Sequence, residues 1–134
     1  MGKIILIALL FVSSLFAEFT TLTTEQFQDA MKQGVKVIDI RRVDEFKQYG
    51  TIKGSYKLTF FDARGKYDIN KWMAQFQQIV TDKNQPFILV CAHSNRSKTV
   101  GKFLSDQAGY KNVKELDGGI IYGWINKGLG TEKN

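Results

Sequence analysis

The sequence predicts an α/β fold in which helices cover both faces of a mostly parallel sheet. Short β-branched runs alternate along the chain with segments whose apolar residues recur at helical spacing, an order typical of right-handed βαβ units. The chain has 134 residues, of which 43% are hydrophobic and 24% are charged. This size and composition fit one globular domain, and no repeat or low-complexity stretch divides the sequence.

The first half of the chain carries signals for two helices and two strands. A capping-box pattern that begins at Thr23 predicts a short helix ending at Gly34. The β-branched run at 35–40 predicts a buried strand, because branched side chains favour the pleated backbone. The segment at 43–49 predicts a short helix, and 54–58 predicts a second short strand.

The second half repeats this alternation. Asp68 is a suitable N-cap for an amphipathic helix that ends near Val80. The wholly apolar run at 87–90 is the clearest strand signal in the chain. Three further elements are expected: a helix from about Ser97 to Gly109, a strand at 113–116 and a helix at 120–127.

Residues 1–17 have the pattern of a secretory signal peptide. Lys3 supplies a positive charge, 4–12 is an unbroken apolar run, and the segment ends in the small residue Ala17. The stretch 4–17, which includes the apolar run, is shorter than the roughly 20 residues that span a bilayer. We therefore expect cleavage after Ala17, a single mature domain over 18–134, a periplasmic or secreted location, and no stable membrane insertion after cleavage.

The net charge of +6 favours anionic partners without naming one. The basic residues form neither a run nor an aromatic-interleaved stripe, so we expect no nucleic-acid partner. The sequence has no metal-ligand spacing and no nucleotide-binding glycine motif, so we expect neither a metal nor a cofactor. We expect a monomer or a weak homodimer.

Cys91 is the only cysteine, so the chain cannot form an internal disulfide. A lone cysteine is most often an inert buried side chain, but Cys91 stands between the apolar run at 87–90 and the next helix. Ligands of parallel sheets bind at the edge where strands end. Loop amides and a helix N-terminus would there favour a thiolate and an anion bound to it, and Arg96 adds a guanidinium.

Three segments resemble the rhodanese sulfurtransferases. The loop from Cys91 to Arg96 is similar to the active-site loop of that family. Upstream, Asp39 and Arg41, then Glu45-Phe46, then the run at 50–55 resemble its D-x-R, E-[FY] and G-x-I-x-G-[AS] segments. Downstream, residues 113–128 resemble its V-x-x-L-x-G-G-x-x-x-W-x-x-x-G ending.

The resemblance implies a rhodanese-like fold with a five-stranded, mostly parallel sheet. It also implies that Cys91 takes sulfane sulfur from a small anionic donor, thiosulfate or polysulfide, and holds it as a persulfide. A nucleophilic acceptor, an unidentified thiol or protein, then receives the sulfur. The implied persulfide-binding loop comprises Ala92, His93, Ser94, Asn95, Arg96 and Ser97.

Within this loop, Arg96 would hold the loop and add positive potential, while Ser97 either donates to the sulfur or caps the helix. Asp39 and Arg41 either support the site or are purely structural. His93 either tunes the pH response or simply faces solvent.

The loop departs from the commonest family pattern, C-R-x-G-x-R, at two positions. Ala92 replaces an arginine, which removes a positive charge near the thiosulfate site. Ser94 replaces a glycine at a position where a permissive backbone is usual. Elsewhere, Thr51 stands where histidine is common.

Two other functions stay open from the sequence. A sulfur carrier that does not turn over would share the persulfide and differ only in its acceptor. A cysteine phosphatase or an arsenate reductase would use a C-x5-R loop to hold a tetrahedral oxyanion. Only four residues separate Cys91 from Arg96, and this shorter loop favours sulfur chemistry.

Overall fold

The computed structural model describes residues 18–133 and contains a five-stranded sheet of order β1-β5-β4-β2-β3. Every neighbouring pair of strands is parallel, which confirms the predicted α/β fold and makes the sheet parallel throughout. The strands are β1 (Glu18–Leu22), β2 (Lys36–Asp39), β3 (Tyr56–Lys57), β4 (Phe87–Val90) and β5 (Asn112–Leu116). The helices are α2 (Thr24–Lys32), α3 (Val43–Tyr49), α4 (Ile69–Ile79), α5 (Asn95–Asp106), α6 (Gly119–Gly123) and the 3-10 helix η1 (Ile125–Lys127).

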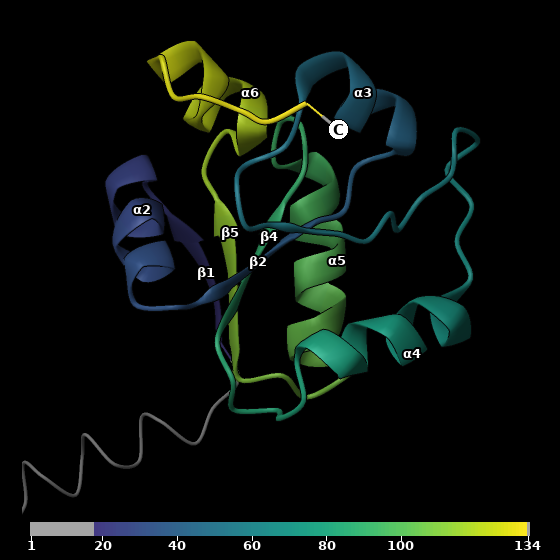
Figure 1. The fold of residues 1–134 in the computed structure, drawn as a ribbon. Helices are drawn as coiled ribbons and strands as arrows, with labels where there is room; N and C mark the ends of the chain where they lie inside the picture. The colour runs from purple at the N-terminus through teal and green to yellow at the C-terminus, as the bar shows by residue number, and fades with distance from the viewer. Residues whose placement is uncertain (1–17, 134) are drawn as a thin grey trace, which may run out of the picture.

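Helices cover the sheet on both faces (Figure 1). On one face, α4 and α5 enclose an aromatic-rich core that includes Trp72, Phe76 and Leu104. On the other face, a second core includes Phe27 of α2 and Ile120 of α6. Both cores form because the amphipathic helices bury their apolar stripes against the strands.

Strand β4 runs through the middle of the molecule and contributes to both cores. Phe87 and Leu89 pack towards α4 and α5, whereas Ile88 and Val90 pack towards α2 and α6. This alternation follows from the period of two along a strand. It continues to Cys91, whose side chain therefore lies on the α5 face.

Strand β1 is the element that the residue patterns did not predict. Its sequence, EFTTL, is mostly polar, and only Leu22 at its end is buried. The strand forms because it pairs along its whole length with β5, from Glu18 beside Asn112 to Leu22 beside Leu116. An edge strand of this kind carries too little apolar periodicity to be recognised from its own residues.

The prediction of one continuous helix at 120–127 is wrong. Trp124 has a φ of −136° and separates α6 from η1. The indole packs edge-on against Phe27 at 5.7 Å between ring centroids, and its Nε1 donates to the carbonyl of Gly130 at 2.8 Å. Packing of the tryptophan into the core therefore outweighs the helical pattern around it.

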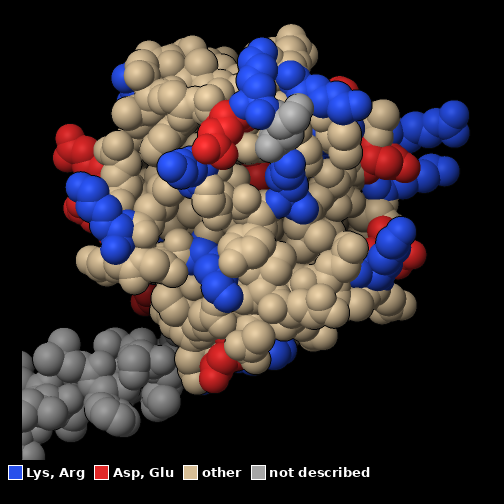
Figure 2. All heavy atoms as spheres, in the orientation of Figure 1, with Lys and Arg blue, Asp and Glu red and all other residues tan. Residues whose placement is uncertain are grey.

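The expected signal peptide at 1–17 lies outside the described residues, so its cleavage stays a prediction. Within residues 18–133, no helix has the length and apolar character needed to cross a membrane. Figure 2 shows Lys and Arg side chains interspersed with Asp and Glu on the visible face.

Candidate functional site

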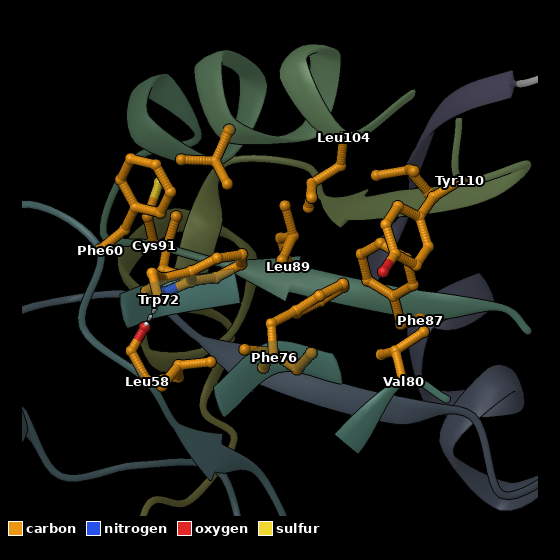
Figure 3. Close-up of a cluster of buried hydrophobic side chains, with 14 residues drawn as sticks. Leu58, Phe60, Trp72, Phe76, Val80, Phe87, Leu89, Cys91, Leu104 and Tyr110 are labelled. Carbon is orange, nitrogen blue, oxygen red and sulfur yellow. Dashed lines mark hydrogen bonds between the residues drawn. The ribbon is translucent and has the colours of Figure 1, made fainter. Parts of the chain in front are cut away.

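Cys91 lies directly after β4, where all four strand residues are buried. The side chain is 1% exposed and belongs to the core cluster that also holds Phe60, Trp72 and Leu104 (Figure 3). In the sheet, β4 lies between β2 and β5. The thiol is thus fixed at the carboxyl edge of a central strand, the place where parallel α/β sheets bind ligands.

The sulfur of Cys91 is hydrogen-bonded to Ser97. The backbone N–H of Ser97 donates to Sγ at 3.3 Å, and the thiol faces the Ser97 hydroxyl at 3.4 Å. Helix α5 begins at Asn95, two positions earlier than expected, so Ser97 already lies in its first turn. The interpretation of Ser97 as a helix cap is therefore wrong: the cap residue is Ser94, which makes no side-chain cap hydrogen bond.

Ser94 adopts the left-handed conformation that the family pattern assigns to glycine. Its φ is +71°, and it is the only non-glycine residue with positive φ within 18–133. Its hydroxyl donates to the carbonyl of Leu116, at the end of β5, at 3.0 Å. This bond offsets part of the cost of a side chain in the left-handed region.

The N-terminal turn of α6 fixes the carbonyl side of the loop. The N–H groups of Ile120 and Ile121 donate to the carbonyls of Cys91 and Ala92 at 2.8 and 3.1 Å. A Cβ on Gly119 would lie 2.3 Å from the carbonyl oxygen of Ala92, and the φ of Gly119 is +64°. Only glycine permits this approach, which explains the glycine at 119.

Arg96 is clamped to α3. Its guanidinium donates two hydrogen bonds to the carboxylate of Glu45, at 2.7 and 2.8 Å. Burial is the largest single influence and alone would raise the pKa of Glu45, but the hydrogen bonds and charges of Arg96 and Arg42 together hold that pKa below its usual value. Arg96 is thus placed to hold the loop, while Glu45 offsets much of the positive potential that we expected from it.

Asp39 and Arg41 form a buried pair at the end of β2. Arg41 donates to both carboxylate oxygens of Asp39, with the shortest bond at 2.7 Å, and to the carbonyl of Gly50 at 2.8 Å. Burial raises the pKa of Asp39 despite its bonds to Arg41. These contacts tie β2 to the end of α3, an arrangement that suits a structural role.

The remaining loop residues differ in exposure. Ala92 is buried, whereas His93 and Asn95 are exposed. The ring of His93 lies 4.9 Å from that of Tyr122 on α6. A hollow of about 430 Å³ opens beside the loop, and its lining includes Asn95 and Arg96. It gives a small molecule room next to the first turn of α5.

Glu115 is a site residue that the sequence interpretation missed. Its carboxylate accepts the Ser97 hydroxyl at 2.7 Å and the Thr21 hydroxyl at 2.6 Å, and it pairs with the ammonium of Lys98. Glu115 is fully buried on the same side of β5 as Val113. A glutamate at an inward position of a buried strand was the available signal.

Within residues 18–133, no group of three or more His, Cys, Asp or Glu side chains is arranged to hold a metal ion. The site is instead a lone cysteine in a tight strand-to-helix loop, with amide and hydroxyl groups around the sulfur. On an all-parallel, helix-flanked sheet, this arrangement defines an α/β protein with a cysteine-loop site.

The chain belongs to the rhodanese-like family, because the model of the rhodanese-like domain matches residues 23–127. The chain is 35% identical over 111 residues to the thiosulfate sulfurtransferase GlpE of Haemophilus influenzae, with 83% of this chain and 92% of that protein covered. It is 30% identical over 115 residues to the protein of the same name from Actinobacillus succinogenes, with 85% and 91% covered.

Two solved structures show the same fold. One is a protein of unknown function from Rhodopseudomonas palustris, described as a possible tyrosine phosphatase, with 28% identity, a TM-score of 0.65 and 85% of each chain covered. The other is the polysulfide-sulfur transferase homodimer of Wolinella succinogenes, with 20% identity, a TM-score of 0.66, and 87% of this chain and 80% of that chain covered. The second likeness concerns the fold alone.

Proposed function

We propose that the protein is a sulfurtransferase in which Cys91 carries sulfane sulfur as a persulfide. The observation that carries this proposal is the position of Sγ at the carboxyl end of β4, where the N–H of Ser97 donates to it from the first turn of α5. A hydrogen-bond donor and the positive end of a helix stabilise negative charge on sulfur. Kinship with a thiosulfate sulfurtransferase over most of the chain agrees with this chemistry.

The reaction has two half-steps. The Cys91 thiolate attacks the outer sulfur of thiosulfate, a bond forms between Sγ and that sulfur, and sulfite leaves with the electron pair of the broken S–S bond. The persulfide anion then carries the negative charge on its outer sulfur. An acceptor nucleophile attacks this outer sulfur, and the Cys91 thiolate is released as the leaving group.

The loop is poorly suited to the second candidate chemistry, phosphoester hydrolysis. A phosphoryl group needs donors for three equatorial oxygens. The guanidinium of Arg96 is already engaged by both carboxylate oxygens of Glu45, and only four residues separate it from Cys91. We therefore expect no hydrolysis of an aryl phosphate above background.

The decisive experiment combines intact mass with an activity assay. Thiosulfate or polysulfide should add 32 Da, the mass of one sulfur atom, to about one site per chain, and cyanide should remove it with formation of thiocyanate. A Cys91→Ser variant should show neither change. Cys91-dependent hydrolysis of the aryl phosphate without sulfur loading would overturn the proposal, whereas loading without turnover would identify a sulfur carrier.

We also propose that the protein acts in the periplasm or outside the cell. The support is the signal-like pattern of residues 1–17 together with the start of β1 at Glu18. Removal of residues 1–17 would leave every described strand and helix in place. Mass spectrometry of the exported fraction should find Glu18, or a residue within one or two of it, at the N-terminus, and an intact Met1 would contradict export by cleavage.

A further inference from the structure

Glu115 lies beneath the Cys91 loop, and the proposed sulfur transfer assigns it no task. It is 0% exposed, and β5 places it beside Leu89 of β4, two residues before Cys91. A buried carboxylate is costly unless its oxygens are paired. Both of its oxygens are engaged here, Oε1 by the Ser97 hydroxyl and Oε2 by Thr21 and Lys98, and the Ser97 hydroxyl is the one that faces the cysteine sulfur.

The Ser97 hydroxyl has a single hydrogen and three acceptors within reach. These are Glu115 Oε1 at 2.7 Å, the carbonyl oxygen of Ser94 at 3.1 Å and Cys91 Sγ at 3.4 Å. A charged oxygen at the shortest distance forms the strongest of these bonds. The hydrogen therefore points to Glu115, and Ser97 turns a lone pair towards the sulfur.

We propose that Glu115 is a positioning residue that withholds the Ser97 hydroxyl from the Cys91 thiolate and so favours the sulfur-loaded state of Cys91 over the empty one. A thiolate on Sγ faces an oxygen lone pair and a nearby carboxylate, whereas a thiol donates its own hydrogen to Ser97. In the persulfide, the charge moves to the outer sulfur and the inner sulfur is neutral. The penalty thus falls mainly on the empty thiolate.

This inference rests on the proposed function and describes how firmly that site keeps its sulfur. Loading is the exchange of Cys91 thiolate and thiosulfate for Cys91 persulfide and sulfite, with equal charge on both sides. An interaction that destabilises only the thiolate raises the equilibrium constant for loading. The factor is the same as the one by which the interaction lowers the thiolate population. Glu115 should therefore favour retention of the sulfur on Cys91.

The charged and titratable groups around Cys91 are mostly matched in pairs. Glu45 of α3 is bound to Arg96 of α5, and Asp39 is bound to Arg41 beyond β2. Two further titratable side chains, His93 of the loop and Tyr122 of α6, lie against each other. Lys98 of α5, which is 46% exposed, carries the charge opposite to that of Glu115, but it binds the other carboxylate oxygen, Oε2. The near oxygen, Oε1, is the one that engages Ser97.

The test is Glu115→Gln, with the rate of Cys91 alkylation by iodoacetamide measured across pH. The Lys98 ammonium is a donor only, so the amide oxygen should face Lys98 and the amide nitrogen should donate to the Ser97 oxygen. The hydroxyl hydrogen is then free for the thiolate. The midpoint of the reactivity profile should fall by about one pH unit, in line with a hydrogen bond to a charged group.

Glu25→Gln is the matched control, because Glu25 is an exposed carboxylate in the first turn of α2 and loses the same charge. Its midpoint should equal that of the wild type. In the Ser97→Ala background, Glu115→Gln should lower the midpoint by less than half as much. An unchanged or higher midpoint in Glu115→Gln alone would overturn the proposal.

Ser97→Ala in the otherwise unaltered chain provides an independent test if Glu115→Gln does not fold. Because the hydroxyl does not donate to the thiolate, its removal should shift the midpoint by no more than about 0.3 pH unit. A rise of one unit or more would show that Ser97 does donate to the sulfur, and the proposal would fail.

The effect on sulfur retention is measured separately. Persulfide-loaded protein is titrated with sulfite, and the loaded fraction is read by intact mass. At a pH above the alkylation midpoints of both proteins, where the empty cysteine is a thiolate, Glu115→Gln should release its sulfur at about tenfold lower sulfite, the factor that corresponds to one pH unit. Alkylation needs no sulfur donor, so a protein that never loads sulfur would refute the proposed function while the alkylation profiles still decide the role of Glu115.

Discussion

The guanidinium of Arg96 is held by both carboxylate oxygens of Glu45, at 2.7 and 2.8 Å, across 51 positions of the sequence. This contact joins the first turn of α5 to α3, two helices that leave different strands of the sheet. It sets the position of the loop that carries Cys91.

Arg96→Lys should weaken sulfur transfer without unfolding the protein. A lysine ammonium cannot reproduce the two parallel bonds that a guanidinium makes to a carboxylate. We expect kcat/KM for transfer to cyanide to fall about tenfold, the size expected for loss of one charge-assisted hydrogen bond. Arg64→Lys is the control, because Arg64 is exposed and takes no part in the contacts of Glu45. Equal losses in both variants would contradict the prediction.

The Glu45 carboxylate should stabilise the fold at neutral pH and lose this effect in acid. The pKa of Glu45 is lower in the folded protein than its usual value, since Arg96 and Arg42 together outweigh the effect of burial. The stabilisation is therefore fully present above the unfolded pKa and disappears as pH falls through the folded pKa. Chemical denaturation should show that Glu45→Gln lowers the free energy of unfolding by about 1 to 2 kcal/mol at pH 7. The gap should close towards pH 3, and a gap that stays constant would refute the assignment.

Substitutions of Ser94 should separate its backbone strain from its hydrogen bond. Ser94→Ala keeps a side chain at a φ of +71° and removes the bond to the carbonyl of Leu116, so stability should fall by about 1 kcal/mol. Ser94→Gly loses the same bond but relieves the left-handed conformation, which costs about 1 kcal/mol for a residue with a side chain. Thermal and urea unfolding should place Ser94→Gly near the wild type. The opposite ranking would show that the conformation carries no strain.

Ala92→Arg should improve the use of thiosulfate. The substitution restores a cation where the family usually has one, beside a doubly charged donor. We expect the apparent KM for thiosulfate to fall about threefold to tenfold, the range of an added charge contact. Gln33→Arg adds the same charge at the end of α2, before β2 begins and thus at the opposite edge of the sheet. An equal effect of Gln33→Arg would indicate that the added charge acts through the overall electrostatic field of the protein and not at a donor-binding site.

Much of the fold is encoded in local patterns. The run at 87–90 predicts β4 to the residue, and the segment at 43–49 predicts α3 with the same bounds. The local sequence of β1 does not predict a strand, because the strand depends on a partner more than ninety positions away. The break at Trp124 depends in the same way on contacts with Phe27 and Gly130.

In the candidate site, too, some features follow from the local sequence and others depend on distant contacts. The place of Cys91 follows from its position after an apolar strand, and the glycine-like conformation of Ser94 follows from the family pattern. The roles of Glu45 and Glu115 require three-dimensional contacts with residues far along the chain. Nothing in the local sequence around Ser97 predicts that its hydroxyl is engaged by a carboxylate of β5.

The dependence of the loop on α6 has a consequence for when the site comes into being. The carbonyls of Cys91 and Ala92 are held by Ile120 and Ile121, and Ser94 is held by Leu116. A ribosome delivers these anchors at least twenty residues after the thiol itself. The loop around Cys91 therefore cannot take its final shape until residues 116–121 have been synthesised, so the nucleophile is assembled after the strand that carries it.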